Sequence, residues 1–268
     1  MKRLLVLLIT VLVLLSGCVK EQRMAIEFTG AEDQGIGFGA ISGIPELQNL
    51  YTFSMVCITR VDASADPYNL LGGIYDVAAP YTDETLGFAI ESDGRVWFRG
   101  PSRVTTDGQW HTDAADIAFD GSIYTIGVSF SGSDTGNDPV FYKNGIALNT
   151  NETSTPNGAL DTGLNSEMFV GSLATVAAGE KPPEGVSYLY AIFDRILAVE
   201  EHKTIHDSRS VVGLDPVFLV YGRGAATQQI YDGQVLAAAD KIIEEINGYA
   251  GTPNASPKGY ADDHLNIR

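Results

Sequence analysis

The sequence predicts an all-β protein built as a jelly-roll β-sandwich, and three observations lead to this prediction. Apolar and polar residues alternate in short runs, which is the period of a half-buried strand. Turn-forming residues separate these runs at short intervals, and glycine is abundant, with 29 among 268 residues. Long helical segments do not alternate with the strands, as a parallel α/β sheet would require. The chain is long enough for one large β domain or two small ones.

The clearest pair of predicted strands lies within residues 123–148. In the first strand the apolar positions share one face and are expected to point inward, namely Tyr124, Ile126, Val128 and Phe130. A polar loop at 131–139 leads to a second strand at Val140–Lys143. Asn144 and Gly145 follow, and this dipeptide predicts a tight hairpin turn because both turn positions need a positive φ.

The rest of the sandwich is predicted from weaker runs of the same kind. Strands are expected at 25–30, 51–60, 70–75, 85–91, 95–99, 168–171 and 187–193. Cys57 shares a strand face with Phe53 and Met55, so we expect it to be a buried small hydrophobe. Segments 101–120 and 149–167 are expected to be mostly loop, and 200–209 to be a short helix.

The sequence changes character after residue 210. A strand is expected at 217–221, and apolar residues at helical spacing predict a helix over 234–247, ended by Gly248. Residues 249–268 are rich in Gly, Pro, Asn and Asp, which predicts a disordered tail. The predicted organisation is therefore a sandwich over 24–210 and a short C-terminal helical extension over 211–268.

Residues 1–17 have the pattern of a signal peptide. Lys2 and Arg3 precede an apolar run of about a dozen residues, which is too short to cross a bilayer as a helix. The run ends in Leu-Ser-Gly followed by Cys18, and this resembles a bacterial lipoprotein signal, cleaved before a cysteine that is lipidated. The resemblance implies a lipid anchor on Cys18 and a short tether over 18–23.

The same resemblance implies a location in the bacterial cell envelope. Neither Val19 nor Lys20 is the aspartate associated with retention at the inner membrane, so the outer membrane or cell surface is favoured. Two alternatives stay open: an uncleaved N-terminal hydrophobic helix, and translation from Met24. A Met24 start would give a cytosolic protein, or a virion component without an anchor.

The charge and cysteine content limit the partners. A net charge of −17 repels nucleic acid and anionic membrane surfaces, so we expect no nucleic acid and membrane attachment only through the lipid. Removal of the signal peptide and lipidation of Cys18 would leave Cys57 as the single free thiol, so no intramolecular disulfide is expected.

Three segments together carry a family resemblance. They are 28–30 (Phe-Thr-Gly), 141–145 (Phe-Tyr-Lys-Asn-Gly) and 190–197 (Tyr-Ala-Ile-Phe-Asp-Arg-Ile-Leu). In order and spacing they resemble the laminin-G-like, concanavalin A-like lectin and glucanase jelly-roll domains over about residues 24–210. This resemblance implies a module that binds carbohydrate or a protein partner, in some members with Ca²⁺.

The same superfamily contains glycoside hydrolases, but the sequence gives no support for catalysis. Retaining hydrolysis needs two carboxyl groups about 5 Å apart. Related glucanases supply them in a Glu-x-Asp-x-x-Glu run, which this chain lacks. Glu91 and Asp93 come nearest, but Asp93 lies in a glycine turn and no acid follows in strand register. We therefore expect a protein that is not an enzyme.

Candidate ligand-binding residues lie on the strand at 95–99, where Arg95, Trp97 and Arg99 share one face. An exposed Trp stacks on the apolar face of a sugar, and arginines bind hydroxyls or acidic sugars. The alternative is that Trp97 lies under a loop and the arginines balance nearby acids.

Candidate metal ligands occur in two places. The loop at 131–138 offers Asp134, Asn137 and Asp138, and such oxygen-rich loops can bind Ca²⁺, although the same residues are ordinary turn formers. His202 and His206 are four apart on the expected helix, a spacing that can hold Zn²⁺, but no third ligand is evident and a solvated helix face is the alternative.

The preferred hypothesis is a non-catalytic cell-surface lipoprotein that binds carbohydrate or a surface protein. A structural or decoration component of a virion or surface assembly is the alternative, and a polysaccharide hydrolase is the least favoured.

Overall fold

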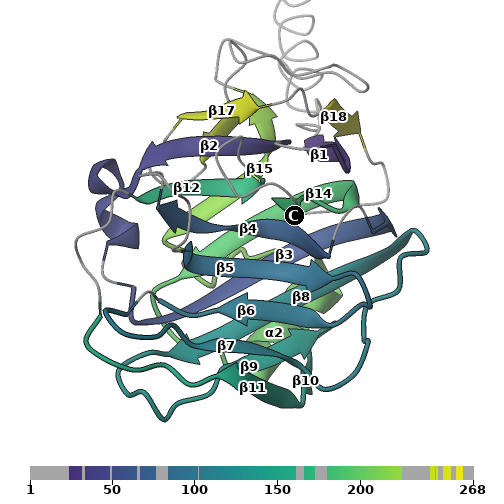
Figure 1. Ribbon diagram of the computed structural model, residues 1–268. Helices are drawn as coiled ribbons and strands as arrows, with labels where there is room; N and C mark the ends of the chain where they lie inside the picture. Colours follow the sequence, from purple (N-terminus) through teal and green to yellow (C-terminus); the bar gives the residue numbers. More distant parts are fainter. Residues whose placement is uncertain are drawn as a thin grey trace, which may run out of the picture.

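The described part of the chain folds into two packed β-sheets with one α-helix on the outside (Figure 1). The structure, a computed structural model, describes residues 24–31, 34–48, 50–64, 67–76, 84–101, 103–160, 166–172, 180–224, 242–244, 246, 250–254 and 258–261. Residues 1–23, with Cys18 and the predicted signal peptide, lie outside these ranges. Among the described residues, no helix is both long enough and apolar enough to cross a membrane.

The first sheet, sheet A, is antiparallel and centred on two long strands. Its spatial order is β10 (Ile146–Leu148), β9 (Val140–Lys143), β8 (Ser122–Ser131), β3 (Thr52–Ala63) and β14 (Glu184–Phe193). The other edge of β14 pairs with β1 (Met24–Thr29) and β15 (Phe218–Gly224). β18 (Lys258–Ala261) pairs with β1, and β16 (Ile242–Glu244) pairs with β15.

The second sheet, sheet B, carries the candidate site. Its spatial order is β17 (Ala250–Asn254), β2 (Gly35–Ala40), β12 (Ser166–Gly171), β4 (Tyr68–Asp76), β5 (Glu84–Glu91), β6 (Val96–Arg99), β7 (Gln109–Thr112) and β11 (Thr150–Ser154). β13 (Glu180–Lys181) adds a short parallel pair to β4. β17 pairs with both β16 and β2 and so joins the two sheets. Two 3-10 helices, η1 (Ile41–Gly43) and η2 (Pro45–Leu47), follow β2.

The main core lies between the sheets and follows the predicted alternation. β3 contributes Phe53, Met55 and Cys57, and β8 contributes the four predicted inward residues, Tyr124, Ile126, Val128 and Phe130. Aromatic rings of Phe53, Phe98, Trp110 and Phe130 pack with centroids 5.2–6.0 Å apart. Burial raises the pKa of the Cys57 thiol to about 12, which confirms that this residue is a buried hydrophobe rather than a reactive thiol.

The predicted hairpin between β9 and β10 is confirmed. Asn144 and Gly145 have φ values of 52° and 76°, in the left-handed region that the turn requires. The Asn144 side-chain oxygen accepts a hydrogen bond from the Thr125 N–H at 2.9 Å. A Cβ on Gly145 would lie 2.5 Å from the Cα of Lys203, so glycine also allows the helix to approach the turn.

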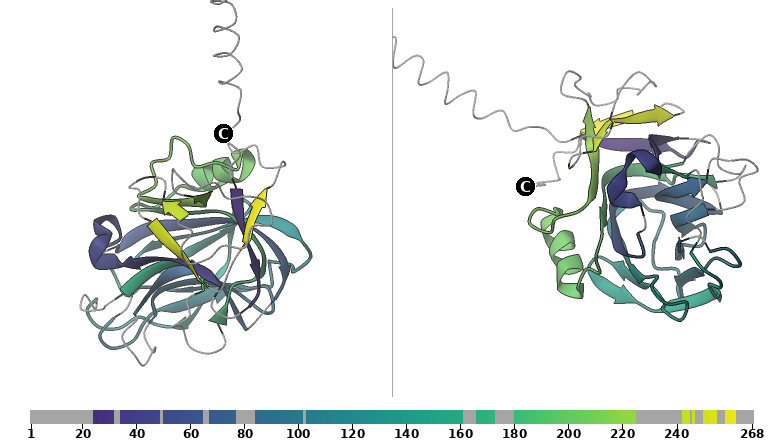
Figure 2. Two further views of the ribbon diagram at one scale, coloured as in Figure 1. Left: turned by 90° about the horizontal axis from the view of Figure 1, so that it is seen from above. Right: turned by 90° about the vertical axis from the view of Figure 1, so that its left-hand side faces the viewer.

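The one α-helix in the described part of the chain, α2 (Val199–Ser208), lies where a short helix was predicted. It covers the outer face of sheet A, as Figure 2 shows. Ile205 packs there against the outward residues of the sheet, which include Val56, Ile58, Leu189, Ala191 and Phe193. The Arg195 guanidinium binds both carboxylate oxygens of Glu201 at 2.7 and 2.8 Å, which fixes the start of α2 to the end of β14.

The structure corrects four predictions about local structure. Residues 242–244 form β16 instead of the end of a helix, while 234–241 lie outside the described residues. β17 and β18 occupy part of the expected disordered tail. β7 and β11 form within two expected loops and pair with each other. β17 and β18 pair with β2 and β1, and β7 pairs with β11, so their partner strands lie far away in the sequence and local composition does not reveal them.

Candidate functional site

The outer face of sheet B brings polar and aromatic side chains from several strands together. On β5, β6 and β7 every second residue points into the core, among them Ile90, Phe98 and Trp110. The residues between them face outward. Strand pairing aligns Ala89, Trp97, His111 and Asn151 in one row across β5, β6, β7 and β11. The row joins residues separated by more than 60 positions in the chain.

The exposed aromatic residue of this face is Tyr68 rather than Trp97. Trp97 is 7% exposed, so the expectation that it offers a free ring is wrong. The Tyr68 ring packs against it, with centroids 5.2 Å apart and planes tilted by 53°. Tyr68 is 37% exposed and lies opposite Glu91 at the start of β4. Trp97 therefore acts as a rigid support beneath an accessible ring.

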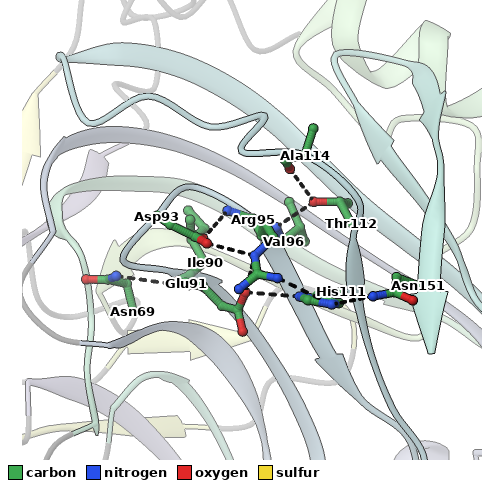
Figure 3. Close-up of polar contacts among 10 residues, drawn as sticks. All are labelled: Asn69, Ile90, Glu91, Asp93, Arg95, Val96, His111, Thr112, Ala114 and Asn151. Carbon is green, nitrogen blue, oxygen red and sulfur yellow. Dashed lines mark hydrogen bonds and ion pairs between the residues drawn. The ribbon is translucent and has the colours of Figure 1, made fainter. Parts of the chain in front are cut away.

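Arg95 is the centre of a polar cluster (Figure 3), which includes Glu91, the residue paired with Tyr68. Its Nε lies 2.8 Å from Glu91 Oε2 and 2.8 Å from Asp93 Oδ2. Its Nη1 lies 3.4 Å from Nε2 of His111. The Arg95 side chain is 32% exposed, so the cluster is open to solvent on one side. Two carboxylates and one histidine therefore fix the position of the guanidinium.

His111 links Arg95 to β11. Its Nδ1 lies 3.2 Å from Glu91 Oε2, and its Nε2 lies 2.9 Å from Nδ2 of Asn151. A guanidinium only donates, so Nε2 of His111 accepts and the ring proton lies on Nδ1, which donates to Glu91. This arrangement holds the imidazole between Glu91 and Asn151. It also orients the exposed Asn151 amide toward the cluster.

Arg99, the third predicted ligand-binding residue, is paired with an acid as well. Its Nη2 donates to Asp107 Oδ2 at 2.7 Å, and Asp107 Oδ1 accepts the Arg103 N–H at 2.5 Å. The Arg103 guanidinium in turn donates to the carbonyl oxygens of Gly132 and Gly158. Arg95 and Arg99 thus balance nearby acids, as the alternative interpretation of this strand held.

The predicted calcium residues each make a separate contact. Asp138 Oδ1 accepts the indole N–H of Trp110 at 2.8 Å, and Asp134 Oδ1 accepts the N–H of Gly136 at 3.1 Å. The Asn137 amide donates to the Ser131 carbonyl at 2.9 Å. No group of three or more His, Cys, Asp or Glu residues that could hold a metal ion occurs among the described residues. Calcium binding at this loop stays a prediction.

The two helix histidines are turned toward sheet A. His202 is 1% exposed, its Nε2 lies 3.0 Å from Ser129 Oγ, and its ring stacks on Tyr142 with centroids 3.7 Å apart. Burial lowers the pKa of His202 to about 4. His206 Nδ1 lies 3.3 Å from Thr125 Oγ1. His202 is therefore part of a packed interface, and neither the zinc nor the solvated-face interpretation describes it.

Glu91 and Asp93 do not form the paired carboxylates of a glycosidase. Both contact the same nitrogen of Arg95 at 2.8 Å, so a cation lies between them. A retaining enzyme needs an acid and a nucleophile that flank a glycosidic bond. The geometry therefore matches a fixed polar cluster better than an acid–base pair.

Sequence reasoning missed Tyr68, His111 and Asn151. Tyr68 lies between the strands expected at 51–60 and 70–75, and His111 and Asn151 lie in the two segments where no strands were expected. Their local sequences give no sign that they meet. Only the pairing of β4, β5, β6, β7 and β11 brings them to Arg95.

Comparison with known proteins identifies relatives only among solved structures. No protein-family model matches the chain, and no curated protein matches it. A candidate carbohydrate-binding protein from Bacteroides ovatus aligns with a TM-score of 0.57 at 12% identity, over 92% of this chain and 61% of that one. This chain therefore spans less than two thirds of the Bacteroides protein.

Two further solved structures agree. A heptameric SAP-like pentraxin from Limulus polyphemus aligns with a TM-score of 0.54 at 11% identity, over 93% of this chain and 100% of that one. The CBM40 of the Ruminococcus gnavus IT-sialidase, bound to α2,3-sialyllactose, aligns with a TM-score of 0.51 at 15% identity, over 68% and 96%. The fold is a jelly-roll β-sandwich. At these identities the likeness shows the fold alone, and the predicted fold class is confirmed.

Proposed function

We propose that this chain is a non-catalytic carbohydrate-binding protein whose binding site is the outer face of sheet B. The observation that carries the proposal is an exposed aromatic ring, Tyr68, next to a fixed polar cluster of Glu91, Arg95, His111 and Asn151. Sugars present apolar C–H faces that stack on aromatic rings and hydroxyl groups that need directed hydrogen bonds. This face offers both within one row of neighbouring strands.

The polar cluster keeps hydrogen-bonding capacity for a ligand. Glu91 uses Oε2 for its contacts with Arg95 and His111, and its Oε1 makes no hydrogen bond to another described residue. Asn151 uses Nδ2, and its Oδ1 likewise has no partner among the described residues. The contacts within the cluster hold both side chains in place, so their remaining oxygens are pre-organised acceptors.

The opposite outer face is unsuited to the same role. α2 lies over sheet A, and its buried side chains His202 and Ile205 fill the space above β8 and β14. The names of two fold neighbours support the ligand class, since one is a candidate carbohydrate binder and another holds sialyllactose. The proposed site therefore combines the accessible face with the chemistry that the neighbours' names suggest.

A glycan array tests the proposal, with purified chain applied at a range of concentrations. The Tyr68→Ala variant is expected to lower the affinity for an array ligand about tenfold, a loss of about 1.4 kcal/mol, because the stacking surface is removed. Ile146→Ala, at an exposed apolar residue on β10, is the matched control and is expected to bind like the parent. The absence of any array ligand contradicts the function, and full affinity of Tyr68→Ala contradicts the site.

We further propose that the module is of laminin-G-like type. We also propose that the chain is a lipoprotein of the bacterial envelope, attached at Cys18 to the outer membrane or cell surface. The support is the signal-like pattern of residues 1–18. Mass spectrometry of the mature N-terminus tests it, since a lipidated Cys18 is expected and an unmodified Met24 or Ala25 contradicts it. The second outcome favours the alternative of a virion or surface-assembly component that uses the same face for a protein partner.

Calcium is proposed as an accessory ion at the loop of Asp134, Asn137 and Asp138, on the basis of its oxygen-rich composition. Calorimetry with Ca²⁺, and melting curves with Ca²⁺ and with a chelator, test this directly. A heat of binding together with a higher melting temperature is expected, and the absence of both contradicts it.

A further inference from the structure

We infer that the ligand of this site is a neutral glycan, recognised through its hydroxyl groups, rather than an acidic sugar; this inference rests on the proposed function. The charge arrangement of the outer face of sheet B leads to it. Two guanidinium groups, Arg95 and Arg99, face three carboxylates, those of Glu91, Asp93 and Asp107. The positive charge of both arginines is therefore balanced from within, with one carboxylate in excess, before any ligand arrives.

Both arginines are held closely by their acids. Arg95 Nε has carboxylate oxygens on two sides, each at 2.8 Å, and Arg99 Nη2 contacts Asp107 at 2.7 Å. Asp107 and the Arg99 side chain are both largely buried. A sugar carboxylate that bound the remaining N–H groups of Arg95 would lie close to the carboxylates of Glu91 and Asp93. Repulsion between these like charges opposes the binding of an acidic sugar.

The remaining groups of the cluster are held by hydrogen bonds. His111 contacts Glu91 through Nδ1, and Arg95 and Asn151 through Nε2. Asn151 is neutral. The chain as a whole carries a net charge of −17, and its field opposes the approach of anions.

A neutral sugar fits the same groups without any exchange of partners. Each hydroxyl is both a donor and an acceptor, and the site offers Glu91 Oε1 and Asn151 Oδ1 as acceptors beside the Arg95 guanidinium as a donor. The Tyr68 ring stacks on a C–H face irrespective of charge. This chain would then share its fold with the CBM40 that holds sialyllactose but differ from it in ligand charge.

The test is an array that carries neutral oligosaccharides and the same oligosaccharides extended with sialic or uronic acid, probed at low and high NaCl. The expected result is binding to the neutral members, with affinity changing less than about twofold with salt, because no ion pair forms with the ligand. Binding only to acidic members, lost at high salt, overturns the inference while the proposed function stands. Binding to neither class overturns both.

A charge-release variant sharpens the result. The double substitution Glu91→Gln and Asp93→Asn removes both carboxylates from Arg95, and it is expected to gain at least fivefold in affinity for the acidic members. Asp62→Asn is the matched control, because it removes the carboxylate of the 2.8 Å ion pair with Arg60 on sheet A. This variant is expected to show no gain in affinity for the acidic members. A folded double variant that gains nothing overturns the inference. If the double variant does not fold, the salt series on the parent chain decides.

Discussion

On the outer face of sheet A, α2 lies over β8 and β14 and buries the outward residues of the sheet. On the outer face of sheet B, the side chains of Tyr68 and Asn151 reach solvent. Both faces contain a histidine bound to neighbouring polar groups. His202 is enclosed between the helix and the sheet, while His111 borders an open cluster. The covering layer, more than residue type, therefore separates structural polar groups from those available to a ligand.

The covered face contains one continuous hydrogen-bonded chain. Ser54 Oγ donates to the Arg195 carbonyl at 2.9 Å, so its contact with Ser129 Oγ at 2.8 Å is donated by Ser129. Ser129 therefore accepts the Nε2 proton of His202 at 3.0 Å. Nδ1 of His202 is left as an unprotonated nitrogen with no partner among the described residues. A second proton on this ring would be buried without an acceptor, which is why the pKa is lowered.

The largest expected effect is on the covered face. Phe193→Ala removes a fully buried ring between β14 and α2 and is expected to lower the free energy of unfolding by about 3–5 kcal/mol. Urea denaturation measures it. Ile196→Ala, at a nearby exposed residue, is the control and should cost much less. A loss below about 1 kcal/mol for Phe193→Ala would show that α2 is not a stabilising layer.

The next effect is a dependence of stability on pH that belongs to the covered histidine. The folded chain binds a proton at His202 only near pH 4, while the unfolded chain binds it near 6.5. The unfolded state therefore takes up more protons in this window, and stability falls as pH decreases from about 6.5 to about 4, by about 3 kcal/mol. Denaturation curves across this range measure the fall.

The His202→Gln variant is the sharper test of this pH effect. Gln has no proton to gain and can still donate to Ser129, so much of the pH dependence between 6.5 and 4 should disappear. His206→Gln should remove a smaller part of this pH dependence, although burial also lowers the pKa of His206. The hydrogen bond with Arg195 lowers the pKa of Glu201, and this shift changes stability only below the ordinary pKa of 4.5. An unchanged slope in His202→Gln would contradict the assignment.

The smallest expected effect is the difference in the free energy of unfolding between variants that remove one polar group from each face. Asn151→Ala on the open face should change the free energy of unfolding by less than about 0.5 kcal/mol, because water replaces its contacts. Ser129→Ala on the covered face should cost about 1–3 kcal/mol, because it leaves the His202 Nε2 proton without an acceptor. Thermal melts of both variants measure the difference. Equal losses would mean that the two faces do not differ as described.

Sequence reasoning predicted the strands whose alternation is strong and found one edge of the candidate site. Trp97 and Arg99 lie on β6 and Arg95 directly precedes it, so the strand begins one residue later than predicted, and the local pattern could not show that the Tyr68 ring covers Trp97. Nor could it show the acids that hold the two arginines, since Asp107 comes from a neighbouring loop. Exposure is set by what packs on a residue, and that partner comes from elsewhere in the chain.

The sequence by itself determined the class of the fold, because strand alternation and the Asn144–Gly145 turn depend on nearest neighbours and backbone angles. Only the tertiary structure decided which outer face is covered, which histidine is buried, and that the last described segments are strands joined to β1, β2 and β15. These outcomes depend on contacts between distant segments, whose hydrogen bonds and burial outweigh local propensity.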